Sequence, residues 1–383
     1  MSVSVIGAGP TGLISAYEAA KREADVVIFE EHKNIGVPVR CAGLLSVSGL
    51  KRLGLPISKR FILNFVKGAI FYSPSGLSFR VYRKTPVACV VDRASFDCFL
   101  ADKALNCGVE IKLGFRVSKV KRLNNEIAVS GVWGSKSYPL LIDAEGFRSL
   151  ILKQLNLQTI NWRDVLPSAQ IELKVNDIEE DFVEVHVGKN IAPGFFAWVI
   201  PLNHESARIG LACKGLNPRK MLKRFIKRRF GVNVEVKSYG GCVLTCGPIP
   251  KTYADNLIVV GDAAGQVKPT TGGGVILGGL CAIKAGFVAS EAIRQENFSS
   301  KFLRMYEKLW KKEFGHEFKT MKFVRDLLNR IPDKWIDKIF DFIVRERLYE
   351  DFSILGDMDM QSTVLGILFK RFILKFPFLL LGL

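Results

Sequence analysis

The first thirty residues alternate between short apolar runs and a glycine-rich turn. Residues 3–6 and 25–30 are apolar runs, and the second run ends in Glu30. Between them, residues 13–22 place apolar side chains on one side of a helix. The pattern therefore predicts a strand, a glycine turn, a helix and a second strand, which is the order of a Rossmann-type βαβ unit.

Further pieces of the same kind follow at intervals. Short apolar runs at 140–144 and 257–260 predict buried strands, and residues 90–108 show helical periodicity. The run at 257–260 leads into a glycine-rich turn and an apolar helix that extends to about residue 293. We expect these pieces to form one discontinuous nucleotide-binding domain. Its three parts are residues 1–50, 87–155 and 250–295.

The remaining sequence has a different period. Residues 68–72 and 77–82 predict the two arms of a hairpin, and residues 165–247 are mostly strand-like around one helix at 218–230. We expect residues 51–86 and 156–249 to form a substrate-binding β-rich domain. Amphipathic helices are predicted from residue 299 onward, so residues 296–383 form a C-terminal helical region. The predicted fold class is α/β, a Rossmann-type domain interleaved with a β-sheet-rich domain and followed by helices.

Composition and charge narrow the choice of partners. Of the 383 residues 48% are hydrophobic and 24% are charged, as in ordinary folded proteins. Lys and Arg number 55 against 37 Asp and Glu, which gives a net charge of +18. Such an excess favours an anionic partner, namely membrane headgroups, nucleic acid or a phosphorylated substrate, although a solvated basic surface gives the same count.

Two basic segments are candidates for a membrane contact. The predicted helix at 218–230 carries seven Lys and Arg residues with Met221, Leu222, Phe225 and Ile226 between them. This amphipathic pattern suits a membrane surface and equally a solvated helix face. The C-terminal tail is the second candidate. Its residues are Phe369, Lys370, Arg371, Phe372 and Lys375.

Cysteines and histidines predict no metal centre. The eight cysteines are scattered, and Cys242 and Cys246 lack the second Cys pair or nearby His that would complete a zinc site. This usage predicts a reducing cytoplasm and no structural metal. The first residues show no signal peptide, and the apolar stretch 363–383 contains three cations and a proline, so we expect no membrane-spanning helix.

The glycine turn carries the first chemical motif. Gly7, Gly9 and Gly12 have the G-x-G-x-x-G spacing between strand and helix, and they let the backbone approach a pyrophosphate at the helix N-terminus. Glu30 ends the second strand, where a carboxylate can accept hydrogen bonds from ribose hydroxyl groups. The combination predicts a dinucleotide site.

A second motif extends the site. Residues 261–265 (Gly-Asp-Ala-Ala-Gly) follow a predicted strand, so Asp262 can hydrogen-bond a polyol chain. Gly272, Gly273 and Gly274 then precede an apolar helix, and their bare N–H groups suit the negative edge of a reduced flavin. NAD would use only the first motif, whereas FAD is long enough to need both.

In this order, the glycine turn, residues 143–146 (Asp-Ala-Glu-Gly) and Gly261-Asp262 resemble the para-hydroxybenzoate hydroxylase-like flavoproteins. Three further segments resemble the geranylgeranyl reductases, and among these the archaeal digeranylgeranylglycerophospholipid reductases. They are residues 38–43 (Pro-Val-Arg-Cys-Ala-Gly), 92–97 (Asp-Arg-Ala-Ser-Phe-Asp) and 196–201 (Phe-Ala-Trp-Val-Ile-Pro). The resemblance covers about residues 1–295.

The resemblance implies FAD-dependent saturation of isoprenoid double bonds and assigns residues to roles. Cys41 and Trp198 are the candidate catalytic residues; the alternative for Cys41 is simple packing against the flavin. The expected substrate-binding residues are Phe195, Phe196, Trp198 and Pro201. The expected cofactor-binding residues are Gly7, Gly9, Pro10, Thr11, Gly12, Glu30, Arg40, Cys41, Ala42, Gly43, Arg93, Gly146, Gly261, Asp262, Ala263, Gly272, Gly273 and Gly274.

One segment departs from the reductase pattern. The reductases usually have Tyr-x-Trp-x-Phe-Pro where this chain has Phe196-x-Trp198-x-Ile200-Pro201, and the Ile-Pro ending resembles the flavin halogenases. A flavin monooxygenase or halogenase is therefore the first alternative, although no catalytic lysine can be placed from the sequence. An RNA-modifying flavoprotein and an electron-transfer flavoprotein are more remote alternatives.

The expected partners follow from the reductase interpretation. They are a prenylated lipid, an anionic membrane surface, and NAD(P)H or a ferredoxin-like protein as electron donor, with no nucleic acid. We expect the protein in the cytoplasm, peripherally bound to the inner face of the cell membrane.

Overall fold

The computed structural model describes residues 2–236 and 239–375, without the side chains of Tyr239 and of residues 372–375. Its first layer is a six-stranded sheet in which β1 lies between β2 and β12, all parallel. The strands in pairing order are β18 (Tyr253–Ala254), β19 (Leu257–Val259), β12 (Leu140–Asp143), β1 (Ser2–Ile6), β2 (Asp25–Glu30) and β8 (Glu110–Leu113).

The two faces of this sheet are covered differently. Alternate residues such as Val3 and Val5 pack on one face against α1 (Pro10–Ala20), α3 (Arg93–Leu105) and α6 (Val275–Arg294). Ile6 and Phe29 point to the other face, toward a three-stranded sheet and a short helix. These are β9 (Lys119–Leu123), β10 (Glu126–Gly131), β11 (Gly134–Tyr138) and α4 (Leu150–Gln154).

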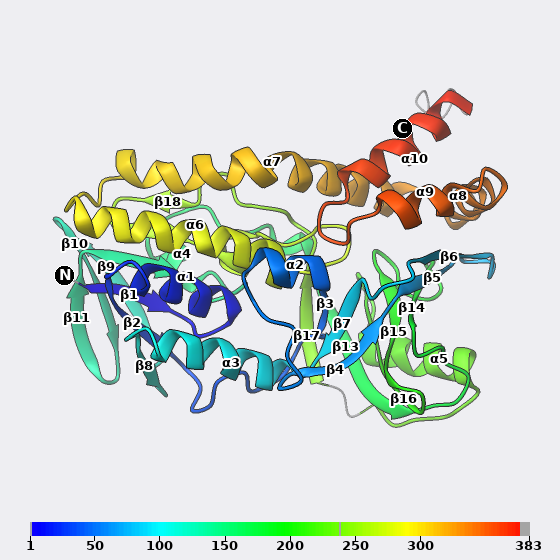
Figure 1. The fold of residues 1–383 in the computed structure, drawn as a ribbon, viewed down its shortest axis with the longest axis horizontal. Coiled ribbons are helices and arrows are strands. Elements are labelled where there is room, and N and C mark those ends of the chain that lie inside the picture. The colour runs from blue at the N-terminus through cyan, green and yellow to red at the C-terminus, as the bar shows by residue number, and fades with distance from the viewer. Residues whose placement is uncertain (1, 237–238, 376–383) are drawn as a thin grey trace.

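The second layer is a seven-stranded sheet at the other end of the molecule (Figure 1). Its strands in pairing order are β17 (Tyr239–Leu244), β13 (Val165–Lys174), β16 (Ser206–Ala212), β15 (Phe196–Asn203), β14 (Phe182–Val187), β5 (Gly68–Tyr72) and β6 (Ser78–Tyr82). α5 (Pro218–Phe230) packs on one face through Met221, Leu222, Phe225 and Ile226.

A small sheet joins the two layers. It pairs β3 (Leu44–Ser46) and β4 (Ile62–Val66) with β7 (Ala88–Val91), and β3 leads into α2 (Val47–Arg52). A single 3₁₀ turn at Trp162–Asp164 precedes β13, and another at Gly261–Ala264 follows β19.

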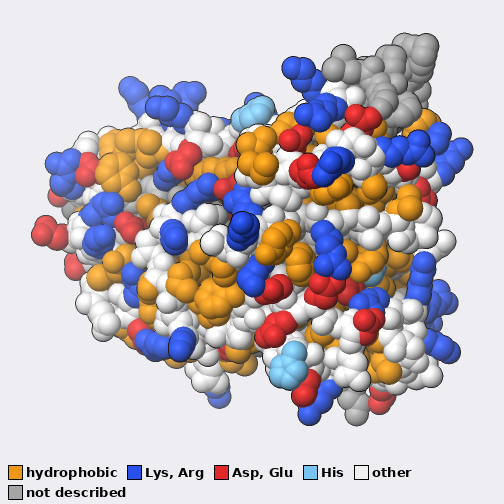
Figure 2. All heavy atoms as spheres, turned by 45° about the vertical axis from the view of Figure 1, so that its right-hand side comes forward, with side chains coloured by type: hydrophobic (Ala, Val, Ile, Leu, Met, Phe, Trp, Pro, Cys, Tyr) orange, Lys and Arg blue, Asp and Glu red, His pale blue; other side chains and the backbone are white. Residues whose placement is uncertain are grey.

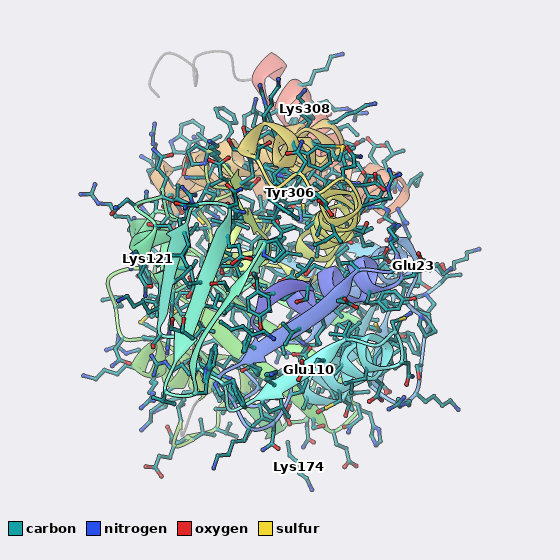
Figure 3. The ribbon with its side chains drawn as sticks, turned by 90° about the vertical axis from the view of Figure 1, so that its left-hand side faces the viewer. Glu23, Glu110, Lys121, Lys174, Tyr306 and Lys308 are labelled. Carbon is teal, nitrogen blue, oxygen red and sulfur yellow. The ribbon has the colours of Figure 1, made fainter. Side chains whose placement is uncertain are left out.

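The C-terminal helices run along the upper side of both layers (Figure 1). They are α7 (Ser300–Arg330), α8 (Asp333–Arg345), α9 (Leu348–Leu355) and α10 (Ser362–Lys375). Figure 3 shows Tyr306 of α7 directed into the protein and Lys308 directed outward. The buried Tyr306 hydroxyl donates to the Val259 carbonyl at 3.1 Å, which ties α7 to the six-stranded sheet.

The predicted fold class is confirmed, with one local error. The periodicity placed a helix at 90–108, but Val90 and Val91 belong to strand β7, and α3 begins only at Arg93. The helix starts there because Asp92 caps it, with its side chain accepting a hydrogen bond from the Ser95 N–H at 2.7 Å. Two buried valines cannot by themselves distinguish a strand from the first turn of a helix.

Helix α6 is the core helix of the first layer. Among the described residues, it alone has the length and composition to cross a membrane, yet 72% of its most apolar window is buried inside the protein. It packs directly on the α1 backbone at Gly286, where a Cβ atom would lie 2.5 Å from the Ser15 carbonyl oxygen. The absence of a side chain at Gly286 therefore sets the distance between the two helices.

We expect Gly286→Val to destabilise the protein by about 1–3 kcal/mol, because α1 and α6 would have to separate. The measurement is the free energy of unfolding in urea, followed by helical circular dichroism. Gly315→Ala in α7 is the matched control, since a Cβ there meets only the Lys311 side chain at 3.6 Å. This control is expected to be neutral or stabilising by up to about 1 kcal/mol, and equal losses for both variants would contradict the packing argument.

Candidate active site

One long cavity of about 1090 Å³ connects the two layers. At one end it is lined by the loops that follow β1, β2 and β12, and at the other by β5, β6, β14 and the helices α8 to α10. The segments 38–43, 195–196 and 272–274 meet in its middle. Chain segments that are far apart in the sequence thus share a single binding space.

The glycine turn forms the first end of the cavity. Gly9 is the N-cap of α1, and a Cβ on Gly12 would lie 1.9 Å from the Gly7 carbonyl oxygen, so the turn closes tightly on the helix. By contrast, a Cβ on Gly9 or on Gly146 would have no neighbouring atom within 4 Å. The fold does not need glycine for packing at these two positions, and both glycines line the cavity.

Glu30 stands beside the turn. Its carboxylate accepts hydrogen bonds from the Ala8 N–H at 2.8 Å and from the His32 N–H at 2.9 Å, which fixes the side chain at the cavity wall. A carboxylate held in this way next to a helix N-terminus suits a ribose hydroxyl group.

A pair of carboxyl groups lies at the end of β12. Burial, and the nearby Glu145, raise the pKa of Asp143 well above its ordinary value, and the Asp143 Oδ2 atom has no hydrogen-bond partner among the described residues. Burial also raises the pKa of Glu145 to about 7, although its carboxylate accepts from the Ile151 N–H at 2.7 Å. Glu145 lines the cavity, although within the segment 143–146 the sequence analysis assigned a cofactor-binding role only to Gly146.

Asp262 and the three glycines form the middle of the cavity. Burial raises the pKa of Asp262, and the nearby Arg93 guanidinium opposes that rise. Gly274 is the N-cap of α6, so the free N–H groups of that helix lie beside Asp262. A Cβ on Gly273 would lie 2.7 Å from the Lys268 side chain, so glycine leaves room for this lysine.

Arg93 lies near both Asp262 and Cys41. Its guanidinium forms an ion pair with Asp97 at 3.0 Å and lies close enough to Cys41 for a side-chain hydrogen bond. The Cys41 sulfur accepts a hydrogen bond from the Gly43 N–H at 3.4 Å. Cys41, Arg93 and Asp262 therefore face the same part of the cavity.

Two residues that the sequence analysis missed hold the Cys41 loop. Gln170 donates to the Cys41 carbonyl at 3.4 Å and accepts from the Trp198 indole N–H at 3.3 Å. Arg208 is buried and donates to the Ala42 carbonyl at 2.7 Å while it pairs with Glu172 at 2.7 Å. Arg208 could have been found from the sequence, because it is the only charged residue in the apolar strand β16.

Aromatic side chains line the next part of the cavity. The rings of Phe195 and Phe196 stack with centroids 4.2 Å apart, and Phe196 meets Trp198 edge-on at 6.1 Å. Arg325 of α7 lies 4.9 Å from the Phe195 ring and donates to the carbonyls of Pro269, Gly194 and Thr270. Burial lowers the pKa of Arg325 to about 10, and no local pattern in the sequence indicates that this residue reaches the site.

The far part of the cavity is apolar. Its walls come from strands β5, β6 and β14 and from the inner faces of the C-terminal helices. The residues are Phe71, Phe79, Val81, Val183, Val185, Val187, Ile336, Ile339, Phe340, Ile343, Phe352, Val364, Leu365 and Leu368.

Most of the residues expected at the site line this cavity. Four of them do not, namely Gly12, Pro201, Gly261 and Ala263. Gly12 and Gly261 instead permit close packing, since a Cβ on Gly261 would lie 2.4 Å from the Thr11 hydroxyl. Pro201 lies outside the cavity because side chains alternate along β15: Phe196, Trp198 and Ile200 line the cavity, and Pro201 points to the opposite face. Within the described residues, no group of three potential ligand side chains could hold a metal ion.

Comparisons with known proteins agree with this geometry. A family profile described as tryptophan halogenase matches residues 71–315, and one described as NAD(P)-binding Rossmann-like domain matches residues 5–43. The digeranylgeranylglycerophospholipid reductase of Methanocaldococcus jannaschii is 32% identical over 99% of this chain and 96% of its own length.

Comparison with solved structures also finds a geranylgeranyl reductase-like protein and a flavin-dependent halogenating enzyme. A geranylgeranyl bacteriochlorophyll reductase-like protein of Thermoplasma acidophilum superposes with a TM-score of 0.87, at 25% identity over 96% of this chain and 95% of the other. A flavin-dependent brominase superposes with a TM-score of 0.71 at 16% identity, over 98% of both chains, which shows a shared fold only. The chain therefore belongs to the digeranylgeranylglycerophospholipid reductase family, within the flavoprotein fold that the tryptophan halogenases share.

Proposed function

We propose that this protein is an FAD-dependent reductase that saturates the C=C bonds of geranylgeranyl chains, in precursors of archaeal membrane lipids. The observation that carries the proposal is the single cavity that runs from the dinucleotide-binding loops past Cys41 and Trp198 into a long apolar space. A polyprenyl chain is long, narrow and apolar, so it matches the shape and chemistry of that space. Membership of the reductase family supports the same conclusion.

The residues at the first end and the middle of the cavity fit FAD rather than a shorter nucleotide. Gly9 and Gly146 line the cavity, and a Cβ atom on either glycine would have no protein atom within 4 Å, so open space lies beside both of them. Glu30 lies at one end for a ribose, and the N-terminus of α6 at Gly274 lies in the middle for an electron-rich ring edge. When bound there, FAD supplies the hydride for the reaction.

The substrate needs more than a hydride. An isolated trisubstituted alkene is not an electrophile, so protonation of one carbon has to precede hydride addition at the other. The protein must therefore provide a proton, exclude water and tolerate cationic character on the tertiary carbon. Phe196 and Trp198 present aromatic faces to the cavity, and a desolvated cation–π contact contributes about 2 kcal/mol.

Cys41 is the proposed proton donor. Its thiol lines the cavity beside Arg93, and the Gly43 N–H holds the sulfur in place. Gln170 links the backbone of the Cys41 loop to the Trp198 indole. The donor and the aromatic wall are thereby held at a fixed separation, which favours protonation at one position on the chain.

We also propose the cellular setting. The reducing equivalents come from NAD(P)H or from a ferredoxin-like protein, and the enzyme works in the cytoplasm, peripherally bound to the inner face of the cell membrane. The net charge of +18 supports attraction to an anionic membrane. We expect no nucleic acid partner.

The first test uses protein reduced with dithionite in the absence of oxygen and incubated with a geranylgeranyl lipid. We expect the product mass to rise in steps of two hydrogen atoms, because each saturated bond gains one proton and one hydride. A brominated or hydroxylated product in oxygenated buffer with bromide and NADPH, together with an unchanged mass under reducing conditions, would assign the protein to the halogenase or monooxygenase activity of the same fold.

The second test concerns the cofactor. We expect Gly9→Val to weaken FAD binding at least tenfold while the thermal midpoint of the cofactor-free protein stays within about 2 °C of the wild type, because the new side chain fills space that only a ligand would use. Titration of the cofactor-free protein with FAD, read by quenching of flavin fluorescence, measures the affinity. Gly240→Val, on an exposed strand position where a Cβ also meets no atom within 4 Å and which does not line the cavity, is the control and should bind FAD as the wild type does.

The third test concerns the proton donor. We expect Cys41→Ala to lower turnover by roughly 100-fold or more, the usual effect of removing a general acid, while the flavin absorbance spectrum is retained. Cys98→Ala is the matched control, because Cys98 is exposed on α3 and lies outside the cavity. Turnover by Cys41→Ala at the wild-type rate would show that the thiol only packs against the flavin.

A further inference from the structure

The cavity is open to solvent, and we define its mouth as the place where exposed or half-buried residues from three parts of the chain line it. Lys67, Tyr82, Arg83, Gly356 and Asp357 line the cavity there. The Arg83 N–H donates to the Lys67 carbonyl at 3.0 Å, and the Arg83 guanidinium donates to the Gly356 carbonyl at 2.6 Å. The link between β4 and β5, the end of β6 and the end of α9 therefore form a common rim.

Exposed apolar side chains lie on the rim or within a few residues of it in the chain. Ile354 and Leu355 directly precede Gly356 and are 73% and 50% exposed. Tyr82 is 46% exposed on the rim itself, and Phe65, two residues before Lys67, is 38% exposed. Leu63 follows the same alternation along β4 and is 49% exposed. Single exposed apolar residues are ordinary on any protein surface, but a group around the mouth of an apolar cavity marks a binding surface.

The segment that supplies two of the three parts of the rim is strongly basic. Residues 32–91 contain ten Lys and Arg and no Asp or Glu, so this segment supplies +10 of the net charge of +18. Some of the cations pair with acids from other segments, for example Lys67 with Asp181 and Arg52 with Asp357, both at 2.8 Å. Lys51, Lys59 and Lys84 are exposed. Figure 2 shows a face of the molecule on which hydrophobic side chains lie among lysine and arginine side chains, with aspartate and glutamate side chains between them.

Helix α5 is the other basic element, and the structure places it away from the cavity. Along β14, Val183 and Val185 line the cavity, whereas Glu184 and His186 point to the opposite face, where Glu184 pairs with Arg229 of α5. The apolar residues of α5 are buried against that face. The helix can attract an anionic surface, but Met221, Leu222, Phe225 and Ile226 are not free to insert into a bilayer, and only the half-buried Phe230 remains among its apolar side chains.

We propose that the rim, formed by Leu63, Phe65, Tyr82, Ile354 and Leu355 with the basic segment 32–91, docks on an anionic lipid bilayer. The apolar side chains enter the headgroup region while the cations contact anionic headgroups, the combination that holds peripheral proteins on membranes. The cavity mouth then faces the bilayer, and a prenyl chain passes into the cavity without crossing water. Docking depends only on the properties of this surface. The passage of the prenyl chain also depends on the proposed function.

The experiment uses the full-length protein and vesicles of phosphatidylcholine with or without phosphatidylglycerol. We expect binding to the anionic vesicles, measured by flotation, to fall at least tenfold in the double variant Ile354→Ser with Leu355→Ser. Leu63→Ser with Phe65→Ser, on the β4 strand that precedes Lys67, should give a loss of similar size. The matched control is Leu105→Ser with Val132→Ser, two exposed apolar residues far from the mouth, which should bind as the wild type does.

A charge variant of α5, Lys223→Glu with Arg224→Glu, separates the two surfaces. We expect it to lose less affinity than either rim variant. Wild-type binding by both rim variants, or a larger loss from the α5 variant, would overturn the docking surface. Thermal midpoints within about 2 °C of the wild type show that each variant is folded, as expected for exposed positions.

Activity on two forms of substrate keeps this proposal distinct from the proposed function. On a short prenyl alcohol dissolved in buffer, the rim variants should match the wild type, and on geranylgeranyl lipid in anionic vesicles they should be at least tenfold slower. Equal rates on the vesicles would contradict docking at the rim. Failure of the wild type on both substrates would contradict the reductase function and would leave the vesicle-binding result to decide the docking surface.

Discussion

The close backbone contact at the carboxyl ends of β1 and β12 is the constraint on which the rest of the site depends. A Cβ on Gly7 would lie 2.4 Å from the Ala144 carbonyl oxygen, and one on Gly12 would lie 1.9 Å from the Gly7 carbonyl oxygen. Only glycine allows these distances, so α1 begins directly above the ends of the strands. Gly286 brings α6 onto α1 in the same way, and the N-terminus of α6 thus reaches the same cavity.

Buried ion pairs then attach distant segments to this centre. Lys268 binds the fully buried Asp359 at 2.8 Å, and Asp359 also accepts a hydrogen bond from Ser46, which caps α2. Arg208, which is buried and pairs with Glu172, connects strand β16 with the loop that carries Cys41 through a hydrogen bond to the Ala42 carbonyl. Such pairs contribute little net stability, because desolvation offsets the attraction, but loss of one partner leaves a charge buried without compensation. Their effect here is to fix the loops around the cavity.

The seven-stranded sheet separates two kinds of surface. One face of β14 lines the apolar cavity and the other carries the Glu184–Arg229 pair beneath α5. Since successive side chains of a strand point in opposite directions, the same six residues serve both surfaces. The basic helix, which was the most evident membrane candidate in the sequence, is for this reason remote from the cavity, and the rim at Tyr82 and Ile354 lies at its mouth.

The sequence by itself determined the local chemistry. The spacing of Gly7, Gly9 and Gly12, the acid at Glu30 and the glycines at 272–274 identified the cofactor region, because these features depend on backbone geometry within a few residues. It also predicted the fold class, since the apolar periods of strands and helices are local properties. The start of α3 was missed, because Val90 and Val91 fit either period.

Only the tertiary structure decided which residues meet across long chain separations. Gln170 reaches Cys41 from 129 positions away, and Arg325 reaches the Gly194 carbonyl from 131. No local pattern encodes such contacts, since they arise from the pairing of strands and the packing of helices. The same holds for three larger features: the course of the cavity along the C-terminal helices, the burial of the apolar face of α5 and the position of the rim. Each depends on which faces of the helices and strands pack together in the folded chain.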